Sequence, residues 1–315
     1  RFVLLSWVAL TACQHLGFSP DIAHANDWQS GLLPLILETR FAWDKARFTN
    51  TKTVLTIHNL MHQGMFGAHT LDDTGLADSS HLFHQEQLTA GVLNHLLTGI
   101  LYASAVTTVS PTYAREIQGD EMGAGLGSFL REKQRSSILV GVLNGIDVDE
   151  WNPASDRHIA RRYSEATLDD KEWNKKALLE AIGLPYVHGL PVAGIVSRLA
   201  WQKGFELVFE ALPPLLARGK LQLVVLGSGA TSYEKRLSAL QQRFPRQVCF
   251  YRGFSDPLAH MIEAGSDMFL MPSRYEPCGL NQLYSLRYGT VPVVRQTGGL
   301  ADSVQQFDTR SLRGT

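Results

Sequence analysis

Short runs of apolar residues alternate with longer helix-like segments, and this alternation constrains the fold more than any other feature of the sequence. The apolar runs lie at residues 53–57, 105–109, 138–143, 192–196, 221–226, 268–271 and 291–294. Each is nearly continuous in apolar residues, as are strands buried on both faces of a parallel sheet. Helix-like segments lie between them, at 87–102, 205–218, 231–243 and 281–288. The alternation predicts an α/β fold built from right-handed βαβ units.

The alternation stops between residues 144 and 190. A charged amphipathic segment at 169–182 predicts a helix there, and a segment punctuated by Gly and Pro at 183–191 predicts a linker. We therefore expect an N-terminal domain at 1–143, a hinge and connecting helix at 144–190, and a C-terminal domain at 191–315. Two doubly wound sheets would place ligand sites at the carboxyl ends of strands that face a cleft.

Composition limits the classes of partner. Of the 315 residues, 44% are hydrophobic and 19% are charged, with 29 basic and 30 acidic side chains. A chain this apolar is globular, and its length favours two domains. A net charge of −1 without a long basic run gives no electrostatic footprint for nucleic acid or for an anionic membrane. Any phosphate-bearing ligand must therefore be held by a few placed cations.

The cysteines and the two ends of the sequence indicate the cellular compartment and whether the chain is part of a longer protein. Cys13, Cys249 and Cys278 are odd in number and widely spaced, which argues against a disulfide framework or structural zinc and favours a reducing, cytoplasmic setting. No apolar stretch reaches the ~18 residues that a membrane helix needs. Residues 1–12 imitate a secretory signal, but we interpret them as a buried helix. With no initiator Met and no helix cap at 311–315, we expect an internal fragment of a longer protein.

Two cations directly follow the apolar run at 192–196. Arg198 can bind phosphate oxygens in bidentate fashion, and Lys203 can add a mobile point charge. The alternative is that both are solvated loop charges.

A second motif, Met271-Pro-Ser-Arg-Tyr-Glu-Pro-Cys-Gly-Leu280, joins a strand to a helix that we expect to begin at Gly279. The first amides of this helix would bind an anion, and Gly279 would permit its close approach. Glu276 could bind sugar hydroxyls or stabilise positive charge, or it could serve only the helix dipole. Thr297-Gly-Gly299 repeats the design after the next strand. Together with the two cations, these turns predict a diphosphate site.

Three further features are less specific. Gly227-Ser-Gly229 has Ser232 where a dinucleotide fingerprint needs its third glycine. Phe254 could stack on a nucleobase or belong to the core. Histidines at 58, 62, 69, 81 and 84 raise the question of a metal site, but there is no H-E-x-x-H motif and we expect no metal.

Taken together, the motifs resemble the bacterial glycogen synthases and plant starch synthases. The blocks that carry the resemblance are 24–29, 56–66, 109–116, 142–147, 196–204, 272–280 and 295–302. They occur in order and cover nearly the whole chain.

The resemblance implies a GT-B fold, in which two Rossmann-like, doubly wound domains face a cleft, with the first and last elements missing here. It also implies a retaining transfer of glucose from ADP-glucose to the 4-hydroxyl at the non-reducing end of an α-1,4-glucan, without a metal or other cofactor. The partners would be ADP-glucose and the glucan, with no nucleic acid and no membrane, in the cytoplasm.

The same resemblance implies roles for single residues. Arg198 and Lys203 match the cations that neutralise the ADP leaving group, Glu276 the carboxylate that holds the donor glucose, and His58 the histidine near that sugar. The positions that match substrate contacts are Asp27, Asn59, Asn144, Phe254, Cys278, Gly279, Leu280, Tyr284, Thr297 and Gly298.

Two departures from the family leave questions open. Tyr284 stands where many other GT-B enzymes have a second Glu, so front-face and double-displacement chemistry both remain. The family's Lys-x-Gly-Gly-Leu loop does not precede Arg1, so we expect this piece alone to be unstable or inactive. The alternatives are a GT-B enzyme with a UDP-sugar donor, a non-catalytic glucan-binding homologue and a Rossmann oxidoreductase.

Overall fold

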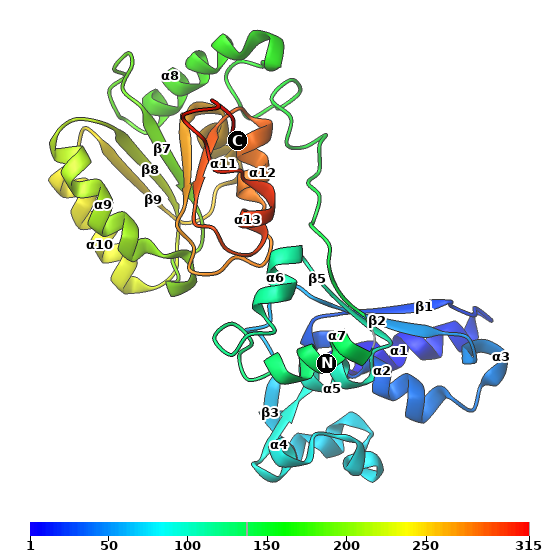
Figure 1. Cartoon of the computed structure of the whole chain (residues 1–315). Coiled ribbons are helices and arrows are strands. Elements are labelled where there is room, and N and C mark those ends of the chain that lie inside the picture. Colours follow the sequence, from blue (N-terminus) through cyan, green and yellow to red (C-terminus); the bar gives the residue numbers. More distant parts are fainter. Residues whose placement is uncertain (137, 315) are drawn as a thin grey trace. The chain divides into compact units, whose positions relative to one another are not determined.

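The chain divides into two units, Arg1–Leu143 and Asn144–Thr315, each built around its own parallel sheet (Figure 1). The structure is a computed structural model and describes residues 1–136 and 138–314. Within these ranges, no helix combines the length and the apolar character that crossing a membrane requires.

The first unit contains a four-stranded sheet in which every neighbouring pair is parallel. Its strands, in spatial order, are β1 (Ile22–Asn26), β2 (Lys52–Ile57), β5 (Ala105–Thr108) and β6 (Leu139–Gly141). A separate antiparallel pair consists of β3 (Met65–Gly67) and β4 (Val92–Asn94). Leu55 and Ile57 of β2 are fully buried in a core that the surrounding helices complete.

The helices of the first unit are mostly short. They are α1 (Phe2–His15), α2 (Leu33–Ile36), α3 (Lys45–Phe48), α4 (Gln85–Thr89), α5 (His95–Tyr102), α6 (Pro111–Glu116) and α7 (Gly127–Ser136). The 3₁₀-helices are η1 (Trp28–Ser30), η3 (Ala68–Thr74) and η4 (Ala77–Leu82), and η2 (Leu37–Phe41) is a short π-helix.

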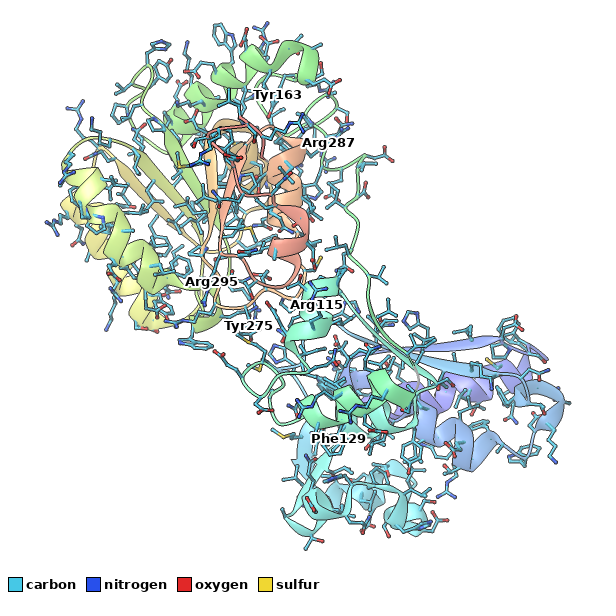
Figure 2. All side chains as sticks on the ribbon, in the orientation of Figure 1. Arg115, Phe129, Tyr163, Tyr275, Arg287 and Arg295 are labelled. Carbon is cyan, nitrogen blue, oxygen red and sulfur yellow. The ribbon has the colours of Figure 1, made fainter. Side chains whose placement is uncertain are left out.

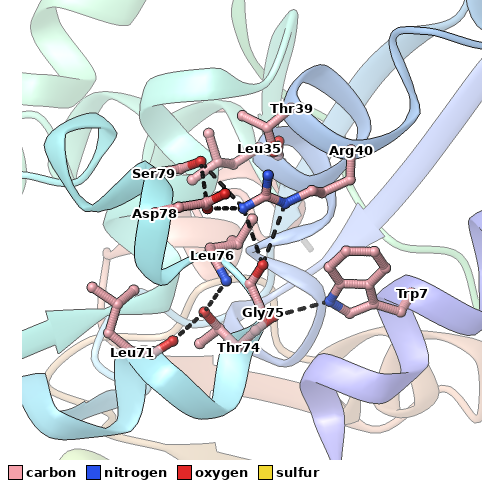
Figure 3. Close-up of polar contacts among 10 residues, drawn as sticks. All are labelled: Trp7, Leu35, Thr39, Arg40, Leu71, Thr74, Gly75, Leu76, Asp78 and Ser79. Carbon is pink, nitrogen blue, oxygen red and sulfur yellow. Dashed lines mark hydrogen bonds and ion pairs between the residues drawn. The ribbon is translucent and has the colours of Figure 1, made fainter.

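Arg40 of η2 connects these short helices through polar contacts (Figure 3). Its guanidinium donates to the Gly75 carbonyl at 3.1 Å and to the carboxylate of Asp78. The Trp7 indole of α1 donates to the Thr74 carbonyl at 3.0 Å. Helices this short have little stability of their own, so such contacts fix their positions.

Two expectations for the first unit are corrected. Residues 1–12 do form a helix, but of α1 only Ser6 and Leu10 are buried, while Leu4 and Leu5 are more than half exposed. The single helix expected at 87–102 is interrupted, because Gly91 adopts φ +82° and the chain then forms β4 before α5 begins.

The second unit contains a five-stranded, all-parallel sheet. Its strands, in spatial order, are β11 (Val291–Val294), β10 (Met268–Met271), β7 (Val192–Val196), β8 (Gln222–Gly227) and β9 (Val248–Arg252). This is the Rossmann strand order. From β7, the chain adds β8 and β9 on one side of the sheet and then crosses over to add β10 and β11 on the other side. The carboxyl ends of β7 and β10 therefore form the topological switch point, where such folds bind ligands.

Helices cover both faces of this sheet (Figure 1). They are α8 (Lys171–Ala181), α9 (Phe205–Ala217), α10 (Thr231–Arg243), α11 (Asp256–Gly265), α12 (Asn281–Arg287) and α13 (Gly298–Ser303), with η5 (Glu165–Asp170) and η6 (Trp201–Lys203). On β8, Leu223 and Val225 join the core beneath α9 and α10, while Val224 and Leu226 join the core beneath α8 and α11. Residues 144–190 belong to this unit, since α8 packs against α11.

Candidate functional site

A cavity of about 180 Å³ lies at the switch point of the second unit. Residues that follow β7 and β10 line it, including Arg198, Lys203, Glu276, Gly279 and Leu280. Typical ligand pockets measure roughly 300–1,000 Å³. The cavity by itself therefore fits one group of a ligand, such as a phosphate or a sugar ring.

Lys203 and Glu276 form the central charged pair of this cavity. Lys203 Nζ lies 2.7 Å from Glu276 Oε2, and the two side chains are 18% and 9% exposed. The Ser273 hydroxyl donates to the same carboxylate oxygen at 2.9 Å. Within the described ranges, Glu276 Oε1 has no hydrogen-bond partner, and Nζ has two donors to spare. The pair can therefore bind an anion through Lys203 and a hydroxyl through Glu276.

The backbone around η6 holds Lys203 against the loop that follows β10. The Arg274 amide donates to the Gln202 carbonyl at 2.8 Å, and the Gln202 side chain reaches the Tyr275 carbonyl at 3.3 Å. Gly204 has φ +66°, and a Cβ there would lie 2.0 Å from the Pro272 carbonyl oxygen. The close approach of the two segments thus requires glycine at 204.

Arg198 lies at the mouth of the cavity and is exposed. Among the residues that the structure describes, no carboxylate forms an ion pair with Arg198, whereas Lys203 is paired with Glu276. Asn281, which also lines the cavity, donates from its side chain to the Val196 carbonyl at 2.7 Å. This bond holds the start of α12 against the end of β7. An unpaired guanidinium at this position is suited to bind phosphate oxygens.

The helix expected to begin at Gly279 begins instead at Asn281, with Leu280 as its N-cap. Gly279 adopts φ +73°, in the left-handed region, so the loop turns there before the helix starts. The first amides of α12 therefore come from residues after Gly279.

The turn after β11 supports the loop that carries Glu276. The Gly299 amide donates to the Glu276 carbonyl at 3.0 Å, and a Cβ on Gly298 would lie 1.9 Å from the same oxygen. Thr297, the N-cap of α13, is buried. Figure 2 shows Tyr275 and Arg295, from the loops after β10 and β11, at the same end of the second unit. Thr297 and Gly298 thus lie next to the cavity without lining it.

Cys278 and Asn144 are in contact with each other, and neither lines the cavity. Burial raises the pKa of the Cys278 thiol, against the opposing effect of a hydrogen bond from the Asn144 backbone. The thiol is therefore protonated at neutral pH and acts as a small neutral group. The Asn144 side chain is exposed.

Phe254 follows the edge strand β9 and is 86% exposed. The alternative that it belongs to the core is therefore wrong, and a free aromatic face remains for stacking. Phe254 does not line the cavity. The nearby Gly227 is explained by packing, since a Cβ there would lie 2.0 Å from the Ser197 carbonyl oxygen.

Tyr284 does not itself line the cavity, although its amide donates to the carbonyl of Leu280, which does, at 3.0 Å. Its ring stacks on the Trp151 indole, with ring centroids 3.8 Å apart and planes 9° apart. The structure thus gives Tyr284 a packing role, and contact with substrate stays a prediction.

In the first unit, Asp27 and His58 meet at the carboxyl ends of β1 and β2. The His58 amide donates to Asp27 Oδ1 at 2.7 Å, and His58 Nε2 donates to Asn26 Oδ1 at 2.9 Å. Asp27 has φ +53°, a conformation that is strained for a residue other than glycine and that often marks functional sites. The Asn59 side chain instead accepts from the Met61 amide at 3.1 Å.

The histidines at 58–84 do not build a metal site in the described ranges. None of them belongs to a group of three His, Cys, Asp or Glu side chains close enough to share an ion.

The sequence reasoning missed Ser273, Asn26 and Asn281, which orient or support the residues it found. Ser273 lies three residues before Glu276, and Asn26 directly precedes Asp27. Their closeness in the sequence to these candidate site residues was the signal that could have identified them. Chemically, the second unit offers two cations and a carboxylate, and the first unit offers an imidazole beside a carboxylate.

Comparison with known proteins identifies related families. Residues 1–132 match the family described as starch synthase catalytic domain, and residues 185–313 match the family described as glycosyl transferases group 1. A glycogen synthase from Anaeromyxobacter sp. (strain Fw109-5) is 49% identical over 316 residues, which is 100% of this chain and 65% of the relative. A glycogen synthase from Myxococcus xanthus (strain DK1622) is 49% identical over 97% of this chain and 63% of its own. The chain thus spans less than two thirds of the length of these relatives.

A similar solved structure is the catalytic domain of starch synthase IV from Arabidopsis thaliana, bound to ADP and acarbose. It has a TM-score of 0.89 and 34% sequence identity, with 99% of this chain and 64% of that chain covered.

Proposed function

Because the chain belongs to the glycogen synthase and starch synthase family and has an α/β fold of the GT-B type, we propose that the protein is a retaining glucosyltransferase. It transfers glucose from ADP-glucose to the 4-hydroxyl at the non-reducing end of an α-1,4-glucan. The observation that carries this proposal is the Lys203–Glu276 pair, 2.7 Å apart, in the cavity that Arg198 also lines. The starch synthase solved with ADP supports an ADP-containing donor.

Arg198 and Lys203 stabilise the leaving group. Breaking the bond between glucose and phosphate builds negative charge on the diphosphate, and fixed cations at that position lower the barrier. Lys203 is held by its contact with Glu276, so little reorganisation is needed when the charge develops. Arg198, exposed at the cavity mouth, offers its planar fork to the phosphate oxygens.

Glu276 binds the donor glucose. Its Oε2 is occupied by Lys203 and Ser273, which leaves Oε1 to accept a hydrogen bond from a sugar hydroxyl. The negative carboxylate also favours the positive charge that develops on the anomeric carbon as the bond breaks. Ser273 acts as a positioning residue that fixes the carboxylate.

In the first unit, His58 and Asp27 supply polar groups that bind a sugar. The Asn26 contact leaves Nδ1 of His58 for a ligand, since no described residue bonds to it. The strained backbone of Asp27 supports a role beyond folding.

The transfer needs no metal, because Arg198 and Lys203 supply positive charge where a metal ion would otherwise do so. We place the protein in the cytoplasm, and its three free cysteines, Cys13, Cys249 and Cys278, are consistent with a reducing compartment.

The test is incorporation of labelled glucose into glycogen by the protein at its full natural length, with ADP-glucose and UDP-glucose as alternative donors at equal concentration. Incorporation from ADP-glucose in clear preference to UDP-glucose is the expected result. Preference for UDP-glucose would show that the donor is UDP-glucose and not ADP-glucose. A folded protein that binds glycogen but uses neither donor would establish the non-catalytic alternative.

A further inference from the structure

A second group of chemically active side chains lies in the second unit, outside the cavity at the switch point. His158 comes from the loop before η5, and Asp256 and His260 come from α11. One candidate ligand atom from each of these side chains lies within 4.8 Å of the other two. In the part of the chain that the structure describes, no other three His, Cys, Asp or Glu side chains come together in this way. We call these three residues the histidine cluster.

His260 is buried and fixed in orientation, with only 1% of its side chain exposed. Its Nδ1 lies 2.8 Å from Asp156 Oδ2, and the Trp151 indole stacks on its ring at a centroid distance of 3.9 Å. Asp156 also accepts hydrogen bonds from the Tyr288 hydroxyl at 2.6 Å and from the His158 amide at 2.7 Å. An ionised carboxylate can only accept hydrogen bonds. Asp156 therefore favours the tautomer of His260 that carries its proton on Nδ1.

The other ring nitrogen of His260, Nε2, is buried and has no hydrogen-bond partner among the described residues. In the tautomer that Asp156 favours, Nε2 carries a lone pair. A buried acceptor without a partner is unfavourable, so a ligand at this atom would be stabilising. Metal-binding histidines commonly have this arrangement, with one ring nitrogen donating to a carboxylate and the other facing the ion.

The other two proposed ligands lie close to the His260 side chain. Asp256 and His260 are four residues apart on α11, so their side chains share one face of the helix. The His158 ring lies 4.9 Å from the His260 ring, measured between centroids. Both Asp256 and His158 are partly exposed, so solvent reaches two of the three proposed ligands.

One neighbouring cation opposes metal binding. The Nε of Arg157 donates to His158 Nε2 at 3.2 Å, so His158 must release this bond or use Nδ1. Arg157 is exposed, and an exposed contact of this kind is weak and easily exchanged for water. The carboxylates of Asp156 and Asp256 supply two negative charges against this one positive charge.

We propose that the histidine cluster binds a divalent transition-metal ion of the Zn²⁺ class, with His158, Asp256 and His260 as ligands and Asp156 orienting His260. Two imidazoles and one carboxylate, with water in the fourth position, suit such an ion. None of the three ligands lines the cavity at the switch point. The ion would therefore lie apart from the site of the proposed glucosyl transfer, where it would join the loop that carries His158 to α11.

The experiment is a titration of the metal-free protein with Co²⁺, followed by visible absorption, and then displacement of the Co²⁺ by Zn²⁺. The variants are His158→Gln and Asp256→Asn, both at partly exposed positions, with circular dichroism to show that they fold. His188→Gln is the control, because His188 is an exposed histidine of the same unit outside the histidine cluster.

We expect one equivalent of Co²⁺ to bind with the absorption bands of a tetrahedral site, and Zn²⁺ to abolish them. Either cluster variant should weaken binding by at least about tenfold, while His188→Gln should bind as the unaltered protein does. No tetrahedral bands in the unaltered protein, or equal affinity in all the variants, would overturn the proposal.

Discussion

Lys203 shows how a single charge in this protein is prepared for its task. Its ammonium group is less than one fifth exposed and bonds to Glu276, which Ser273 also contacts. The geometry is therefore set before any ligand arrives. Fixed charges in partly buried sites stabilise developing charge more than mobile ones in water do. This predicts that Lys203 contributes to the rate of the chemical step.

Replacing Lys203 with alanine tests this contribution. We expect Lys203→Ala to lower kcat by about 10²-fold or more, because a cation that faces the diphosphate leaving group is lost. The measurement is the initial rate of glucose incorporation at saturating donor. Lys220→Ala is the matched control, since Lys220 is an exposed lysine of the same unit that does not line the cavity. An unchanged kcat in Lys203→Ala would contradict the role assigned to this residue.

Among the secondary structure elements, the turn from η6 into α9 positions the site most directly. Gly204 ends η6 in the left-handed region, and its Cα faces the Pro272 carbonyl of the loop after β10. The two loops that carry Lys203 and Glu276 are thus in backbone contact.

The pair of variants Gly204→Ala and Gly219→Ala separates this contact from backbone strain. Both glycines have φ near +65°, but a Cβ on Gly219 would meet no atom within 4 Å. We expect Gly219→Ala to cost about 1 kcal/mol of unfolding free energy through strain alone. Gly204→Ala should cost clearly more and should also lower activity, because the η6 turn must move away from Pro272. Urea unfolding and rate measurements check both, and equal losses in the two variants would show that the close approach is unimportant.

At the same scale, the sequence predicts some elements well and others poorly. The runs at 192–196, 268–271 and 291–294 coincide with β7, β10 and β11. Their apolar runs are continuous, which is the pattern that identifies strands in a doubly wound sheet. Strand β1 is not among the apolar runs, because its sequence, IAHAN, contains two polar residues and only Ala25 of the strand is buried.

The interruption of the segment at 87–102 has a different cause. Strand β4 forms there because β3 lies opposite it. The two strands are far apart in the sequence: β3 begins at Met65 and β4 begins 27 residues later, at Val92. Local periodicity carries no information about such a partner, whereas a glycine at position 91, inside the expected helix, was a local signal in the sequence.

The sequence alone pointed to individual residues of the candidate site, but it did not show which of them contact one another. Polar residues after buried strands pointed to Arg198, Lys203 and Glu276, because parallel strands bring their carboxyl ends to one edge. The 2.7 Å pairing of Lys203 with Glu276 joins residues 73 positions apart. Only the strand order, with β7 beside β10, brings these two loops together.

For the whole molecule, the arrangement of the cores suggests how the chain unfolds. Each hydrophobic core cluster lies within one unit: one in Arg1–Leu143 and the others in Asn144–Thr315. Chains with separate cores commonly depart from two-state unfolding. We therefore expect each unit to have its own transition.

Matched core variants in the two units test this expectation. Leu55 of β2 and Leu223 of β8 are both fully buried, one in each unit. Replacing either with alanine should cost about 2–5 kcal/mol through lost burial and the cavity left behind. In calorimetry, Leu223→Ala should lower the temperature of the second unit's transition and leave the first unit's transition unchanged. Leu55→Ala should do the reverse. If both variants shifted the same single transition, the units would unfold together, and interactions beyond the separate cores would have to couple them.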